Sequence, residues 1–453
     1  MDYTLSKYSF ATNRAIGEKS FGLLFSGRTG QNTYVSKEAY DHIMSRNWSN
    51  LSKNTRDTLI KHKIIVPDTE DELESINQEN REMLESQKEK PLYISLQPTA
   101  YCQLACVYCG QQHVNKHMTS EIIQTILARV SKKLDNGTFS GLRIGWFGGE
   151  PLCSLKNMRI LNQGLKDIAE KHNLPYSGNL TTNGYMLSID LYKELKEDFN
   201  INKIEITLDG DREHHDTHRM TCNGQGSFDK IFDNLMSVVT SDCYDKDKCL
   251  LSVRCNVDEN NVDGVMPLLN LIVENEIQDK INFYTASVIS WAHNGAGSDD
   301  ARKRLGEATT EIFAFMIQNG FHVSVLPRRC PPFMCLGTDM DAEMYDAEGN
   351  IFDCSETSYS DYYVDKGLVL GNVMHDDTTH TKRSDINRIP SMLLNKEIQP
   401  CRECKFYPLC GGLCPLALME GTPRCPSFIH NIEDLMFLDF LVKQRQKQAQ
   451  KQQ

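Results

Sequence analysis

The 453-residue chain has no long hydrophobic run and no surplus of basic residues. No stretch stays apolar over the length of a bilayer-spanning helix, and the first twenty residues contain no apolar segment like that of an export signal. Lysine and arginine number 49 against 61 aspartates and glutamates. The resulting net charge of -12 opposes bulk affinity for nucleic acid or anionic lipid. These absences predict a cytoplasmic protein with neither nucleic acid nor membrane as a partner.

Cysteine, by contrast, is abundant, with sixteen residues in the chain. In a reducing compartment these thiols are expected to serve as metal ligands or redox groups rather than in disulfides. The hydrophobic and charged fractions, 40% and 24%, are those of an ordinary globular protein. The length exceeds what one core usually supports, so two or three domains are expected.

The segment 1–67 contains no cysteine and predicts a small α+β module. Its expected elements are two hairpin strands, two helices and a closing strand, at 21–25, 33–35, 37–46, 53–62 and 63–66. Residues 68–90 are almost all polar and acidic. That composition predicts a helical or flexible linker that buries little.

Residues 91–320 alternate short apolar segments with amphipathic ones. Six segments fit buried strands: 92–97, 142–147, 178–182, 203–208, 250–257 and 281–288. Six fit helices: 121–134, 158–171, 189–197, 227–239, 262–273 and 307–318. Repeated β-then-α units predict an α/β fold with a parallel sheet, here a partial (β/α)6 TIM-like barrel with its chemistry at the carboxyl ends of the strands.

Cys102, Cys106 and Cys109 form a C-x3-C-x2-C array directly after the first of these strands. Three thiolates in one loop can hold three irons of a 4Fe-4S cube and leave the fourth open to another ligand. Zinc usually takes four ligands, and only His113 and His117 are near enough in the sequence to add one. The spacing alone leaves an iron-sulfur loop, a zinc loop and three buried thiols open.

The array resembles the signature of the radical S-adenosylmethionine superfamily, including an aromatic residue, Tyr108, before the last cysteine. The resemblance implies that the cysteines bind the cluster, and that S-adenosylmethionine binds its open iron and is cleaved to methionine and a 5'-deoxyadenosyl radical. Gly148, Gly149 and Glu150, after the second strand, resemble the family's glycine-rich element, which holds the methionyl amino group. Glycine lets backbone approach a ligand closely. A plain turn between strand and helix is the alternative.

Polar residues at the ends of the next strands predict the rest of the cofactor site. The sequences Thr-Thr-Asn-Gly at 181–184 and Thr-Leu-Asp-Gly at 207–210 end the third and fourth strands and are expected at the same rim. The resemblance implies that such groups, with basic or amide side chains beyond them, hold the carboxylate and ribose of the cofactor. The candidates are Asn183, Thr207, Arg219, Arg254 and Asn256. For the last three, a surface or barrel-interior position fits the sequence equally well.

The C-terminal cysteines follow a second spaced pattern. A C-x13-G-x4-C arrangement precedes a C-x2-C-x5-C-x3-C arrangement, and a last cysteine ends the series: Cys335, Gly349, Cys354, Cys401, Cys404, Cys410, Cys414 and Cys425. A pair of zinc knuckles is the alternative, because C-x2-C also serves zinc. The pattern resembles the SPASM domain of peptide and sulfatase maturases, which implies two auxiliary 4Fe-4S clusters and three clusters in all.

The resemblance also implies a ligand set for each auxiliary cluster. By position, the ligands of the first would be Cys330, Cys335, Cys354 and Cys414, and those of the second Cys401, Cys404, Cys410 and Cys425. Cys330 lies outside the spaced motif, so a first cluster with an open iron stays possible. Fully ligated clusters would act mainly as electron relays. The other cysteines follow no cluster spacing and are expected to be ordinary thiols: Cys153, Cys222, Cys243, Cys249 and Cys255.

These motifs predict five regions. They are a recognition module, an acidic linker, the radical core, a SPASM domain and a C-terminal helix with its tail, over 1–67, 68–90, 91–320, 321–428 and 429–453. The first region loosely resembles the winged-helix element with which peptide maturases bind a leader peptide as an added strand, and a structural cap is the alternative. An electron donor such as flavodoxin or ferredoxin is the other expected partner.

Three functions fit the sequence. The first is a maturase that modifies, by a crosslink, a ribosomally synthesised peptide. The second is an anaerobic sulfatase-maturing enzyme, although such enzymes begin closer to the radical motif and carry an aspartate where this chain has Ser355. Asp353 and Glu356 flank that position as candidate acid or base residues. The third, a metal-binding protein without catalysis, requires an inert radical motif.

Overall fold

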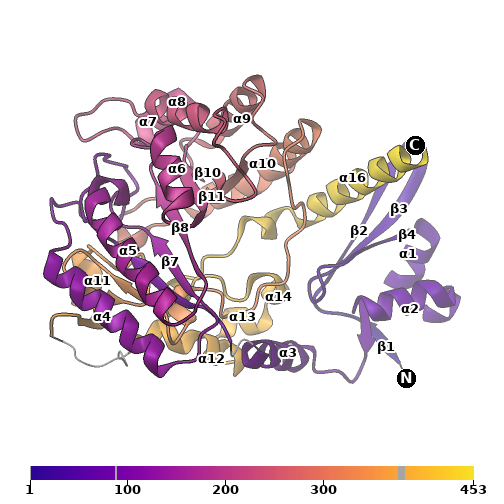
Figure 1. The fold of residues 1–453 in the computed structure, drawn as a ribbon. Helices are drawn as coiled ribbons and strands as arrows, with labels where there is room; N and C mark the ends of the chain where they lie inside the picture. The colour runs from indigo at the N-terminus through magenta and orange to yellow at the C-terminus, as the bar shows by residue number, and fades with distance from the viewer. Residues whose placement is uncertain (1, 87–88, 376–382, 453) are drawn as a thin grey trace.

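The computed structural model describes residues 2–86, 89–375 and 383–452, which form an N-terminal module, a central barrel and a C-terminal region (Figure 1). The N-terminal module contains two small antiparallel sheets. Strands β1 (Tyr3–Leu5) and β5 (Ile65–Pro67) form one, and β2 (Ser9–Ile16), β3 (Lys19–Ser26) and β4 (Asn32–Ser36) form the other. Helices α1 (Lys37–Met44) and α2 (Lys53–Lys61) complete the module. The predicted hairpin, helices and closing strand are all present.

The acidic segment forms a packed helix, α3 (Glu72–Ser86), and the expectation that it buries little is wrong for one face. Ile76, Asn77 and Asn80 are buried there, and the Asn77 amide donates to the carbonyl of Leu394 on α12 (Ile389–Leu394) at 2.9 Å. Charged residues cover the rest of the helix, which is why its composition resembles that of a linker.

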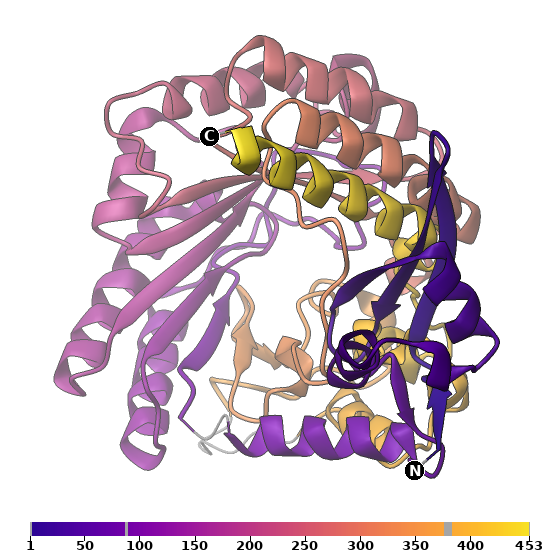
Figure 2. The same ribbon diagram turned by 90° about the vertical axis from the view of Figure 1, so that its right-hand side faces the viewer.

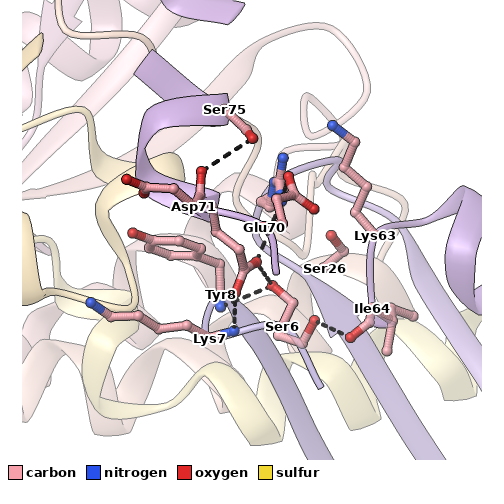
Figure 3. A network of polar contacts seen from close by, with 12 residues as sticks. Ser6, Lys7, Tyr8, Ser26, Lys63, Ile64, Glu70, Asp71 and Ser75 are labelled. Atoms are coloured by element: carbon pink, nitrogen blue, oxygen red, sulfur yellow. Dashed lines mark hydrogen bonds and ion pairs between the residues drawn. The ribbon is translucent and has the colours of Figure 1, made fainter. Parts of the chain in front are cut away.

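An ionic network joins the N-terminal module to α3 (Figure 3). Arg28 is 2% exposed, and its guanidinium lies 2.9 Å from the Glu70 carboxylate and 3.4 Å from that of Glu72. Glu79 is paired with Lys63 of the module at 2.6 Å and with Arg329 at 2.5 Å. The guanidinium of Arg329, which precedes Cys330, also donates to Asn80 at 2.8 Å. The network therefore links the module to the cysteine-rich region through α3.

The central region is the partial (β/α)6 barrel that the sequence predicted. Its parallel strands are β6 (Leu92–Leu96), β7 (Leu142–Trp146), β8 (Tyr176–Thr182), β9 (Ile201–Thr207), β10 (Leu250–Val257) and β11 (Asn282–Ser287). The helices on its outer face are α4 (Ser120–Asn136), α5 (Leu155–Lys171), α6 (Ile189–Glu197), α7 (Arg212–His218), α8 (Phe228–Val239), α9 (Val265–Glu274) and α10 (Asp299–Gln318) (Figure 2).

Side chains alternate between the two faces of this sheet. Leu142, Ile144 and Trp146 of β7 are buried in the core that the sheet forms with its helices. Arg143 and Gly145, between them, belong to the inner face, as the period of two in a strand requires. The main core therefore lies outside the barrel, and polar groups line its interior.

The C-terminal region extends the same sheet beyond β6. The added strands are β12 (Glu343–Tyr345), β13 (Asn350–Phe352) and β14 (Gly371–Asn372), of which β12 runs parallel to β6. A buried ionic group fastens this extension to α4, because the Glu343 carboxylate lies 2.9 Å from Arg129 and 3.0 Å from Lys133. The short helices of this region are α11 (Asp361–Asp365), α12, α13 (Gln399–Glu403), α14 (Tyr407–Cys410) and α15 (Pro415–Met419).

The last helix, α16 (Ile432–Gln452), returns to the N-terminal module and packs against β2 and β3 (Figure 1). The rings of Phe21 and Phe440 lie 5.1 Å apart, and the Tyr34 hydroxyl donates to Asp439 at 2.6 Å. The two ends of the chain thus share one small core. Among the described residues, no helix has both the length and the apolar content to span a bilayer.

Candidate active site

The loop after β6 carries the cysteine triad to the carboxyl ends of the barrel strands. Cys102 is buried, and Cys106 and Cys109 are partly exposed. All three side chains line one cavity of about 270 Å³. His113 lies next to the triad, with its Nε2 3.5 Å from the Cys109 sulfur, whereas His117 contacts Ser154. The fold therefore brings the three thiols to a shared space at the functional end of the barrel.

Tyr108 fastens this loop to the strand ends. Its hydroxyl donates to a carboxylate oxygen of Asp209 and accepts from Arg219 at 2.6 Å and from the Asn256 side chain at 3.0 Å. The second oxygen of Asp209 accepts the backbone N–H of Asn256 at 2.7 Å. Burial is the main cause that raises the pKa of Asp209, and the positive charge of Arg219 opposes it. One hydroxyl thus joins the cysteine loop to β9, β10 and the end of α7.

Glycine at 149 is required by the approach of β7 to the cysteine loop. A Cβ atom built on Gly149 would lie 2.5 Å from the Tyr101 carbonyl oxygen. Gly148 has a φ of +121°, a conformation that side-chain-bearing residues rarely adopt. The glycine pair therefore lets two backbone segments approach each other at the rim of the cavity, and its contact with the methionyl amino group stays a prediction.

Glu150 uses its carboxylate to hold the chain itself. One oxygen accepts the Leu152 N–H at 3.0 Å and the Thr182 hydroxyl at 2.7 Å. The other accepts the Asn183 N–H at 2.7 Å. Burial raises the pKa of Glu150, and these hydrogen bonds act against the rise. The residue fixes the ends of β7 and β8 relative to each other.

The sequence-predicted cofactor contacts all line the same cavity as the cysteine triad. They are Gly148, Gly149, Glu150, Asn183, Thr207, Arg219, Arg254 and Asn256. Arg219 is buried in the Tyr108 network and acts as a positioning residue there. Arg254 is more exposed, and its Nε donates to Asn256 at 2.7 Å. Their contacts with a cofactor stay predictions.

Of the two candidate acid or base residues, only one lies in the cavity of the cysteine triad. Glu356 lines the cavity with the cysteine triad, and burial raises its pKa while Arg254 opposes the rise. Asp353 is fully buried elsewhere, and its carboxylate accepts the N–H and the hydroxyl of Ser384 at 3.1 and 2.7 Å. Of the two, Glu356 has the position for proton transfer in the cavity.

Four C-terminal cysteines meet at a second, small cavity closed by apolar residues. The thiols that line it are those of Cys401, Cys404, Cys410 and Cys425. Burial, followed by the charges of the neighbouring cysteines, raises the pKa of Cys401 to about 11 and that of Cys410 to about 12. The four cysteines line one apolar pocket and are of the type and number that bind a 4Fe-4S cluster, although the described residues are not arranged as a preformed metal site.

Three of the four cysteines predicted to bind the first auxiliary cluster interact with one another. Cys335, Cys354 and Cys414 act on one another electrostatically: burial and then neighbouring charges, including those of the other two thiols, raise the pKa of Cys354. The Cys330 thiol donates to the Pro331 carbonyl at 3.8 Å, and the Cys330 N–H donates to the Pro408 carbonyl at 3.0 Å. Its role as a fourth ligand stays a prediction.

Sequence reasoning missed the polar residues of the barrel interior. Tyr93, Arg143, Asn179, Lys203 and Glu205 lie on consecutive strands and line a third cavity, of about 590 Å³, beside the first. The available signal was a polar residue at every second position of otherwise apolar strands. The sequence also gave no role to the hydroxyl of Tyr108 or to Asp209.

The fold and site define an iron-sulfur enzyme built on a partial α/β barrel. Residues 96–241 match the family model described as the radical SAM superfamily. This part of the chain is therefore a radical SAM domain, the domain of enzymes that use a 4Fe-4S cluster and S-adenosylmethionine.

Curated relatives are similar over most of their length. A cysteine-type anaerobic sulfatase-maturating enzyme of Clostridium perfringens is 23% identical over 350 residues, which cover 72% of this chain and 89% of that protein. An uncharacterized Synechocystis protein is 22% identical, over 70% of this chain and 82% of its own length. Among solved structures, the enzyme anSMEcpe with bound AdoMet has a TM-score of 0.58 and 19% identity, over 77% of this chain and 97% of that one. That likeness shows a shared fold.

Proposed function

We propose that this enzyme modifies a ribosomally synthesised precursor peptide, most simply by forming a crosslink within it. The N-terminal module carries the proposal. The module precedes the radical SAM domain, which begins at residue 96, and is additional to it. In the described residues β4 pairs with β3 alone, and its other edge would accept an extended leader peptide as an added strand.

The residues at the strand ends are suited to hold the two cofactors. Cys102, Cys106 and Cys109 would bind the cluster, and the glycine pair, which lines the same cavity, would hold the methionyl group. When bound, cluster and S-adenosylmethionine together supply a carbon radical that can remove hydrogen from an unactivated carbon. Glu356, which lines the same cavity, would take up the proton that leaves the substrate.

The C-terminal cysteines would hold two auxiliary clusters that carry electrons away from the substrate. The proposed ligands of one of them, Cys401, Cys404, Cys410 and Cys425, all line one pocket. A donor such as flavodoxin or ferredoxin would supply electrons to the radical cluster. We place the enzyme in the cytoplasm, because all sixteen cysteines are free and iron ligation needs reduced thiols.

Maturation of a sulfatase is the second candidate, favoured by the names of the relatives that match most of this chain. These enzymes are named for converting a cysteine or serine of a sulfatase. The candidate accounts for the barrel and the cysteine-rich region, and it gives no role to the N-terminal module.

Anaerobic co-expression separates the two candidates. The enzyme is expressed with the small peptide encoded beside its gene and, separately, with a sulfatase, and both products are analysed by mass spectrometry and with an aldehyde-reactive hydrazide. A peptide that loses two hydrogens and does not react with the hydrazide supports the crosslink. An aldehyde on the sulfatase with an unmodified peptide would transfer the assignment to the second candidate. Co-expression with Cys102→Ala is the control and should leave both partners unchanged.

A further inference from the structure

The barrel interior holds a second compartment beside the cofactor cavity. It is lined from consecutive strands by Tyr93, Arg143, Asn179 and Lys203, and from the C-terminal region by the segment 333–336. Thr181 and Glu205 line both this compartment and the cavity of the cysteine triad. The two spaces therefore adjoin within one barrel. A closed barrel of this type fills its centre with branched apolar side chains, so an open, charged interior indicates a ligand.

Most charges of this interior are matched. The Glu205 carboxylate lies 3.1 Å from the Lys203 ammonium and 3.8 Å from the Arg254 guanidinium, and it accepts the Tyr284 hydroxyl at 2.7 Å. The other carboxylate of the compartment, Asp339, is paired with Lys90.

Arg143 is the exception. It is exposed toward this space, and no carboxylate in the described ranges pairs with it. It contributes an unmatched positive charge inside a protein whose net charge is -12.

Apolar groups stand beside this cation. The Tyr93 ring and Phe333 line the same compartment, and so does Met334, which is 69% exposed. Gly145 leaves room for the tyrosine, since a Cβ there would meet the Tyr93 hydroxyl at 2.1 Å. Cys335, a predicted ligand of the first auxiliary cluster, lines the compartment too. A ligand that matches this space carries an anionic group with apolar groups next to it.

We propose that Arg143 binds a carboxylate of the peptide substrate and so fixes the modified segment between the radical cavity and Cys335. The inference rests on the proposed function and names its substrate class: a peptide that carries, near the modified site, an acidic side chain among apolar ones, or that ends there in its C-terminal carboxylate. The planar guanidinium suits this task because it can donate two parallel hydrogen bonds to one carboxylate.

Calorimetric titration of the anaerobically reconstituted enzyme with bound S-adenosylmethionine and no reductant tests this binding without turnover. The first probe is a leucine-flanked glutamate pentapeptide, acetylated and amidated, and the second is its glutamine counterpart. A third probe is the glutamine peptide with a free C-terminal carboxylate. We expect the glutamate peptide or the free-acid peptide to bind about tenfold more tightly than the neutral one, because charge-assisted hydrogen bonds exceed neutral ones by that order. Whichever charged probe binds identifies the source of the carboxylate.

Two variants locate the effect. Arg143→Gln should remove the preference for the charged probe, and Lys230→Gln, which loses the same charge from an exposed site on α8, should keep it. Equal affinities of wild type for charged and neutral probes, or a preference that survives Arg143→Gln, would overturn the proposal. Because no catalysis is measured, such a result leaves the proposed maturase activity standing. An enzyme that binds the charged probe but modifies no peptide would instead count against that activity.

Discussion

The Tyr108 hydroxyl links the cysteine loop to three polar residues of the barrel rim, Asp209, Arg219 and Asn256. Arg219 and Asp209 are themselves buried, so the hydroxyl provides a partner that water cannot replace. Its contribution is positional, because it sets where the three thiols stand relative to the strand ends that are predicted to hold the cofactor.

Tyr108→Phe should therefore weaken cofactor binding while the cluster still assembles. We expect unchanged iron content and an affinity for S-adenosylmethionine lower by about tenfold, the order expected for one lost buried hydrogen bond to a charged group. The measurement is the electron paramagnetic resonance signal of the reduced cluster, titrated with S-adenosylmethionine. Tyr101→Phe, an exposed tyrosine in the same loop, is the matched control. Equal titration curves for the two variants would exclude the positional role.

The residue scale also shows where sequence reasoning ends. The cysteine triad and the glycine pair were found because their spacing within one segment reflects the chemistry directly. Tyr108 acts through partners on other strands, Asp209, Arg219 and Asn256, and nothing in the neighbouring sequence marks these contacts. Asp353 and Glu356, three positions apart, looked alike in the sequence and differ in the fold, since only Glu356 lines the cavity.

At the scale of elements, the long strands and helices of the barrel were predictable from hydrophobic periodicity, and the structure confirms them. Helix α7 was missed because its sequence, Arg-Glu-His-His-Asp-Thr-His, has no apolar stripe. Strands β12 to β14 were missed because each has two or three residues and forms only by pairing in turn onto the edge of the sheet at β6. The packing of α3 was missed because its buried face is small and partly polar.

The ionic network at α3 predicts how the N-terminal module is attached. Arg28→Met leaves the Glu70 and Glu72 carboxylates without their buried partner, which should cost about 3–5 kcal/mol and release the module. Limited proteolysis between β5 and α3 measures the release. Arg14→Met removes a surface pair with Asp434 and should cost less than about 1 kcal/mol. Equal cleavage of the two variants would contradict this role of the network.

In the whole molecule, the three groups of cysteines and the N-terminal module, which we propose to bind the peptide, are arranged around one barrel. The sheet continues from the barrel into the cysteine-rich region through β12, and α16 carries the chain back to the N-terminal module. This continuity predicts a division of labour, in which the triad serves cofactor cleavage and the C-terminal cysteines serve the later electron transfer. The ligand set of each C-terminal cluster stays a prediction.

The most direct measurement is the formation of 5'-deoxyadenosine from S-adenosylmethionine under strong reductant, compared among wild type, Cys102→Ala and Cys401→Ala. The account predicts formation by wild type, none by Cys102→Ala, and retained formation without modified peptide by Cys401→Ala. Wild-type protein that contains iron and sulfide yet leaves S-adenosylmethionine intact, or a Cys102→Ala variant that cleaves it normally, would contradict the account.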